Sequence, residues 1–167
     1  MEKSGFFNSS DGDRVYDATD FAAYFGSLVS NGIFYATVTN LQVSPGIGLA
    51  VSVAAGSAWI TGYRYENTDA LNMLLATANG SNPRIDRIVV RLSQINRSIR
   101  LAVVTGTPAA TPVAPALTRT SDIYELGIAD VLIPTAATVI APNNITDTRL
   151  NASLCGTVNS LVTAIYE

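Results

Sequence analysis

The sequence contains no histidine and one cysteine. Without histidine the chain lacks the commonest general base and a common zinc ligand. Cys155 alone can form neither an internal disulfide nor a thiolate zinc site, and its place beside Gly156 suggests a small buried side chain. These absences exclude His-dependent catalytic triads and the usual zinc sites.

Charge is also scarce, because Asp, Glu, Lys and Arg make up only 14 % of the chain. An ordinary soluble domain carries roughly 25 %. A surface rich in Ser, Thr, Asn and Ala is common where the exterior is buried against other subunits, although a secreted β protein can share it. The net charge of −3 gives no general attraction to nucleic acid or to anionic membranes. We therefore expect protein partners, and neither nucleic acid nor membrane.

Long apolar runs are missing too. No stretch approaches the ~20 apolar residues of a membrane span. The N-terminus lacks the apolar run of roughly 7–15 residues that marks a signal peptide. The 167 residues fit one domain with a short appendage, and we expect synthesis in the cytoplasm.

A helix is the clearest local prediction. It follows a polar arm, and Asp17 can cap its first turn, where Asp20 adds negative charge. Asn31 and Gly32 suit its C-terminal end. One apolar stripe with helical spacing contains Phe21, Tyr24, Phe25, Leu28 and Val29.

After the helix the apolar period changes to two, which predicts strands. The stretch 105–120 carries three prolines without periodicity and should be an extended connection. At 84–93 and 99–103, alternation predicts two half-buried strands of a hairpin. Further strands are expected at 41–43, 49–54, 58–61, 63–66, 71–77, 124–133 and 145–150.

These elements predict a mainly β fold, an antiparallel β-sandwich-like domain with an N-terminal α-helix and a short C-terminal helix. Residues 1–32 would form the arm and helix, 33–154 the β domain, and 155–167 the C-terminal helical segment.

Two sets of apolar residues are candidate interaction sites. The arm and helix hold more aromatic rings than one helix needs to cover a small sheet, so we expect 5–32 to attach the protein to another chain. The C-terminal stripe predicts self-association as a homotrimer, and folding back onto the β domain is the alternative. The first set is Phe6, Phe7, Tyr16, Phe21, Tyr24 and Phe25, and the second is Val158, Leu161, Val162 and Ile165.

Carboxylates offer the remaining chemistry. Asp11, Asp13 and Asp17 resemble the start of a calcium loop, but Ala22 stands where such a loop has glutamate. A solvated turn that leads into the helix cap is the favoured interpretation. A glycosidase pair on one strand is disfavoured against surface ion pairs, and its members would come from Asp122, Glu125 and Asp130. We expect no catalytic residues, no metal and no cofactor.

Basic and aromatic residues in the strands have two interpretations each. Arg87, Arg91 and Arg100 could form a basic stripe, but the chain has only ten Lys and Arg, so we expect ion pairs with carboxylates such as Asp86 or Asp130. A group of three aromatic residues suits a half-buried strand pair better than a sugar-stacking platform. That group is Trp59, Tyr63 and Tyr65.

Several segments in order carry a resemblance. They are 5–9 (GFFNS), 12–16 (GDRVY), 20–21 (DF), 58–63 (AWITGY), 65–67 (YEN), 84–89 (RIDRIV), 105–108 (TGTP), 115–119 (PALTR), 145–147 (ITD) and 149–150 (RL). Together they resemble the N-terminal module of tail-fibre, baseplate and receptor-binding proteins of phages and prophages of Gram-positive bacteria.

The resemblance implies a β-sandwich-like shoulder or upper-baseplate domain in the virion, with its N-terminal side towards the tail. The expected function is structural: to connect a fibre or receptor-binding assembly to the tail. Its partners would be other tail or baseplate proteins and a distal receptor-binding protein. The alternative is a carbohydrate-binding β-sandwich that contacts the host cell surface.

Overall fold

The computed structural model describes residues 4–162 and is mainly β. Within these residues lie one α-helix, one 3-10 turn and three antiparallel sheets, with strand orders β10-β9-β7-β8, β1-β4-β5 and β2-β3-β6. No helix there is long and apolar enough to cross a lipid bilayer. The elements are α1 (Ala18–Leu28), β1 (Gly32–Ile33), β2 (Val43–Pro45), β3 (Ala50–Val53), β4 (Gly56–Ile60), β5 (Tyr63–Asn67), β6 (Leu71–Leu74), β7 (Arg84–Ser93), β8 (Ser98–Val104), β9 (Ile123–Ile133), η1 (Pro142–Asn144) and β10 (Ile145–Asp147).

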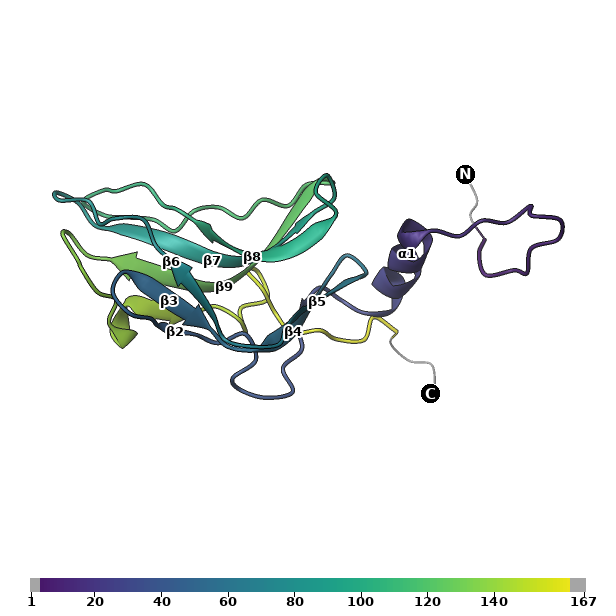
Figure 1. Ribbon diagram of the computed structural model, residues 1–167, viewed down its shortest axis with the longest axis horizontal. Helices are drawn as coiled ribbons and strands as arrows, with labels where there is room; N and C mark the ends of the chain where they lie inside the picture. Colours follow the sequence, from purple (N-terminus) through teal and green to yellow (C-terminus); the bar gives the residue numbers. More distant parts are fainter. Residues whose placement is uncertain (1–3, 163–167) are drawn as a thin grey trace.

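The sheets form a sandwich-like domain. The four-stranded sheet is one layer, and the two smaller sheets follow one another along the other layer (Figure 1). Alternating side chains such as Val51 of β3, Ile60 of β4 and Ile88 of β7 are fully buried in one cluster between the layers. Each buried side chain of this size contributes roughly 1.5–3 kcal/mol. The predicted fold class is confirmed.

Strand β7 is more deeply buried than its pattern predicted. It lies between β8 and β9, and Val89 and Arg87 on its second face are buried as well. The proline-containing stretch 105–120 reaches this face, where the Pro115 carbonyl accepts a hydrogen bond from Arg87. The prediction of a half-buried strand was therefore wrong for β7, because a segment distant in sequence contributes to its cover.

The C-terminal helix is absent from residues 155–162, so that prediction was wrong for the described part of the segment. Thr157 forms a β-bridge with Ile33, and the Leu161 N–H donates to the Leu28 carbonyl at 2.8 Å. Pairing with the edge of β1 and with the end of α1 satisfies backbone groups that a helix would have paired locally. Ile165 lies outside the described residues.

Gly32 does not cap the helix, contrary to expectation. Helix α1 ends at Leu28 with the extended residue Val29 as its C-cap. Gly32 belongs to β1 with φ of 152°, where a Cβ would lie 2.5 Å from the carbonyl carbon of Thr157. The glycine is needed for this close approach of the C-terminal segment.

Candidate functional site

Helix α1 begins with a complete capping box. The Asp17 carboxylate accepts from the N–H groups of Thr19 at 2.8 Å and Asp20 at 3.1 Å. The Asp20 carboxylate in turn accepts from the Asp17 N–H at 3.0 Å. These local bonds hold the first turn, so the helix can extend from the β domain without a sheet beneath it. Figure 1 shows α1 and the arm, residues 4–16, beyond the strands at one end of the molecule.

The helix contacts the β domain through its small residues. Ala22 is its one buried residue, and Gly26 lies near the turn between β4 and β5. In that turn Thr61 and Gly62 both have positive φ, and a Cβ on Gly62 would collide with the Ala22 carbonyl. This tight two-residue turn lets the helix approach closely on one side. The aromatic side chains of α1 point away from this close contact and remain about half exposed.

The aromatic residues of the arm and helix lie in one region, here called the aromatic cluster: Phe6, Phe7, Tyr16, Phe21, Tyr24 and Phe25. Ring contacts connect five of them, and Phe7 joins through the hydrogen bonds between its backbone and the Tyr16 hydroxyl. Phe6 is its centre, with ring centroids 5.6 Å from Tyr16, 5.7 Å from Phe21 and 4.8 Å from Tyr24. The helical members Phe21, Tyr24 and Phe25 remain 42–47 % exposed. All six residues predicted for attachment lie in this one region.

The arm is held in place by its own side chains. The Tyr16 hydroxyl accepts from the Phe7 N–H at 2.9 Å and donates to the Phe7 carbonyl at 3.3 Å. The Arg14 guanidinium lies 5.4 Å from the centre of the Phe7 ring, and Asp13 accepts from the Ser10 N–H at 2.7 Å. The cluster is thus organised before any partner binds.

The aromatic surface continues onto the β domain, which the sequence interpretation missed. The Phe25 ring lies 5.9 Å from Trp59, and Phe34 lies 6.3 Å from it on centroids. Trp59 pairs with Arg64 across the β4–β5 hairpin, whereas Tyr63 pairs with buried Ile60. The three residues belong to a half-buried strand pair, as predicted, but Trp59 lies on the opposite face from Tyr63 and Tyr65. The sequence could have predicted this, because side chains alternate between the two faces of each strand. Counting outwards from the Thr61-Gly62 turn places Trp59 on one face and Tyr63 on the other.

The second predicted set does not join the cluster. Leu161 and Val162 are exposed near the base of α1, and Val158 donates its N–H to the Ile33 carbonyl at 2.9 Å. The described part of this segment folds back onto its own chain. Residues 155–162 therefore present no helical stripe.

Two of the three strand arginines, Arg87 and Arg91, pair with carboxylates of the same domain, as predicted. Arg87 binds both oxygens of Asp130, at 2.6 and 2.9 Å. Arg91 of β7 binds Glu125 at 2.6 Å. Arg100 of β8 pairs with Arg91 in the strand register, and its side chain is exposed.

The other expected partner, Asp86, pairs with Arg84 instead. The Arg84 Nε lies 2.9 Å from the Asp86 carboxylate, and both side chains are buried. Arg84 also donates to the carbonyls of Thr77 and Ala76, and Asp86 accepts from the Gly106 N–H at 2.9 Å. This pair ties two loops to the start of β7.

The carboxylates weighed as a catalytic pair do not share an open site. Glu125 is 1 % exposed, and its second oxygen accepts from the Thr118 N–H at 2.7 Å. Asp130 is bound to Arg87, and Asp122 lies at the exposed surface. In residues 4–162 no group of three His, Cys, Asp or Glu is placed to hold a metal ion, the stretch 11–17 included.

A further ion pair joins Asp147 and Arg149, which lie in two of the segments that carry the resemblance. Arg149, which is buried, binds both oxygens of Asp147 and donates to the carbonyls of Val38 and Asn40. Hydrogen bonding from Arg149 holds the pKa of Asp147 below its ordinary value of 3.8. The folded-state pKa is lowered, so this contribution to stability is present above pH 3.8 and is lost as the pH falls below it.

Cys155 is buried, and burial raises its pKa to about 12 from the ordinary 9.0. We expect a thiolate-specific reagent at pH 8 to label the native protein roughly a thousandfold more slowly than the urea-unfolded chain, because three pH units separate these pKa values. Burial of the neutral thiol stabilises the fold fully below pH 9, and this contribution is lost as the pH rises towards 12. Equal labelling rates in the two states would contradict this burial.

No family model, no curated protein and no solved structure matches this chain. Its function must therefore be inferred from its own residues. The main features are an aromatic cluster that projects from a β domain and ion pairs that join segments within that domain.

Proposed function

We propose that the chain is a non-enzymatic structural protein of a phage tail or baseplate, which connects a fibre or receptor-binding assembly to the tail. The aromatic cluster is the observation that carries this proposal. The cluster belongs to the arm and helix, which extend from the β domain (Figure 1). This arrangement is the one expected of a separate attachment element. The sequence resemblance points to the same end of the protein, since it places the N-terminal side against the tail.

The cluster has the chemistry of a protein-binding surface. Large aromatic side chains dominate the binding energy of protein interfaces, and Phe21, Tyr24 and Phe25 offer such groups on one helix. Their contacts with Phe6 and the Tyr16–Phe7 hydrogen bonds already order the arm. Binding would therefore lose less conformational entropy than ordering a free segment.

The β domain suits a connector because its charges act within the fold. Arg84, Arg87 and Arg149 each join segments that are distant in sequence or in different strands. These internal ion pairs favour a rigid domain, which can hold its partners in a fixed arrangement. They leave few free charges on the surface to attract charged ligands.

We further propose that the protein self-associates as a homotrimer. The low charge of the chain leaves little repulsion between copies, and Leu161 and Val162 remain exposed near the base of α1. Light scattering should give about three times the 17.6 kDa of one chain. Replacing Leu161 with Asp should weaken the assembly. A monomer at tens of micromolar, about the range of weak specific complexes, would contradict the trimer.

Deletion of residues 1–16 tests the attachment element. The β domain and the α1 cap lie outside the deleted stretch, so the truncated protein should still fold. Its free energy of unfolding should differ from that of the full-length protein by no more than about 0.5 kcal/mol. It should no longer be incorporated into tails, because Phe6 and Tyr16 are lost from the cluster. Normal occupancy of the truncated protein in purified particles would refute the role of the arm.

A further inference from the structure

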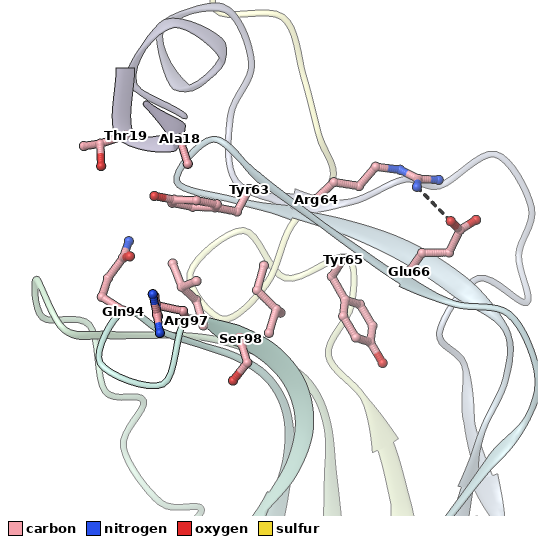
Figure 2. Close-up of a pocket in the computed structure, with 11 residues that line it drawn as sticks. Ala18, Thr19, Tyr63, Arg64, Tyr65, Glu66, Gln94, Arg97 and Ser98 are labelled. Atoms are coloured by element: carbon pink, nitrogen blue, oxygen red, sulfur yellow. Dashed lines mark hydrogen bonds and ion pairs between the residues drawn. The ribbon is translucent and has the colours of Figure 1, made fainter. Parts of the chain in front are cut away.

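A cavity opens at the end of the β domain nearest α1. Its volume is about 720 Å³. Tyr63 and Tyr65 of β5 line one wall. Gln94 and Arg97 of the β7–β8 turn and Ser98 at the start of β8 lie opposite them (Figure 2). Ala18 and Thr19 in the first turn of α1, Leu92 and Ile99 on β7 and β8, and Arg64 and Glu66 on β5 complete the lining.

Strand register builds the tyrosine wall. Tyr63 and Tyr65 pair with Ile60 and Ala58, which are buried, so the two rings point to the inner side of the sandwich. Both side chains pack against the core cluster and stay partly exposed. The result is an aromatic wall that remains half-buried and open at one side.

The opposite wall is a fixed turn. Ser93 pairs with Ser98, which leaves residues 94–97 as the hairpin tip. The Gln94 N–H donates to the Asp122 carbonyl at 2.8 Å, and the Arg97 N–H donates to the Gln94 carbonyl at 3.2 Å. Arg97 has φ of +48°, a left-handed conformation that is costly for a side chain other than glycine, asparagine or aspartate.

The polar groups of the two walls are not bound to one another. Among the side chains drawn in Figure 2, the one side-chain hydrogen bond joins Arg64 to Glu66 at 2.7 Å. The Gln94 amide and the Arg97 guanidinium face the cavity opposite Tyr63 without bonding to it. Burial raises the pKa of Tyr65, so its phenol stays neutral and can both donate and accept.

This lining matches the chemistry of a sugar. A pyranose has a face of C–H groups, which packs on an aromatic ring, and a rim of hydroxyls, which bind amides and guanidinium groups. Ligand pockets of this kind span roughly 300–1,000 Å³, so the cavity has room for one or two sugar units. A lipid chain would leave these polar groups without partners.

We propose that this cavity binds a sugar unit of a polysaccharide, with Tyr63 against its apolar face and Gln94 and Arg97 on its hydroxyls. The cavity and the aromatic cluster are formed by different residues. Sugar binding and attachment to the tail can therefore be tested independently of each other. It would give the connector a contact with glycan in addition to its protein partners.

The test is a titration of the isotopically labelled full-length protein, followed by NMR, with four soluble probes: maltotriose, chitotriose, β-1,4-galactotriose and trigalacturonic acid. At least one probe should shift the backbone amides of Tyr63, Gln94 and Ser98, with a dissociation constant on the order of 1 mM. Failure of all four to move these amides at about 20 mM, well above that constant, would overturn the proposal.

Two variants keep the result independent of folding. Arg97→Gly removes the guanidinium at a position where glycine adopts the positive φ without strain, so the fold should be retained and binding weakened about tenfold. Arg100→Gln is the matched control, because it also removes one positive charge from the β7–β8 hairpin. Arg100 follows Ile99 on β8, so its side chain points to the opposite face from Ile99, which lines the cavity. An equal loss of binding in both variants would overturn the proposal by showing a nonspecific charge effect.

Discussion

Replacing Arg87 with glutamine is expected to lower the free energy of unfolding by about 3–5 kcal/mol. The Arg87 side chain is 7 % exposed and bonds to both oxygens of Asp130 and to the Pro115 carbonyl. Glutamine is too short to replace all three bonds, which leaves a carboxylate and a carbonyl without partners in a poorly hydrated place. Urea unfolding followed by fluorescence measures the change.

Arg100→Gln provides the matched control, since it makes the same charge change at an exposed position on the neighbouring strand. Its effect should stay within about 0.5 kcal/mol. Adding Arg91→Gln to Arg87→Gln should destabilise further, because Glu125 is buried against Arg91. If Arg87→Gln and Arg100→Gln had equal effects, or if the wild type showed salt-sensitive DNA binding that the double variant lost, the structural role of these arginines would be refuted.

Replacing Phe21 and Phe25 together with serine should remove binding to the tail while the β domain stays folded. Central aromatic residues of an interface contribute about 2 kcal/mol or more each, so affinity should fall at least about a thousandfold for the pair. Neither ring lies in the buried cluster of the β domain, and the helix cap at Asp17 is untouched. The amount of the variant incorporated into particles measures tail binding, and its unfolding midpoint shows whether the β domain is still folded.

Ile47→Ser is the control for that double variant. Ile47 is 98 % exposed on a loop of the β domain, so the substitution also exchanges an exposed apolar side chain for serine. It should be incorporated normally. If the control and the double variant were lost from particles to the same extent, the aromatic cluster would have no special role.

Local signals explain which parts of the fold could be predicted. The capping box at Asp17 and the apolar spacing from Phe21 depend on neighbours within one or two turns, and α1 formed where they indicated. Strands β7 and β9 also formed where their own apolar residues predicted strands. The second covered face of β7 and the extended course of Thr157 depend on contacts with distant segments, which a sequence period does not contain.

The candidate site also has a part that the sequence predicts and a part that depends on contacts between distant segments. Aromatic density in the arm and helix is visible in the sequence, and five of the six predicted rings contact one another. The extension to Trp59 and Phe34 requires the relative position of α1 and the β4–β5 hairpin, which the Ala22–Gly62 contact determines. The partner of Asp86 was also misassigned, because Arg84 lies on the same face of β7 as Asp86 whereas Arg87 points to the opposite face.

The central claim is that the arm and helix attach this protein to a phage tail. The most direct test is a cross-link map of purified particles from a strain that encodes the chain, with photo-reactive groups placed at Phe21 and, as the control, at Val139 on an exposed loop of the β domain. The proposal predicts that the protein is present in the particles and that Phe21, but not Val139, cross-links to a tail or baseplate protein. Absence of the protein from purified particles, or cross-links from Val139 alone, would contradict it.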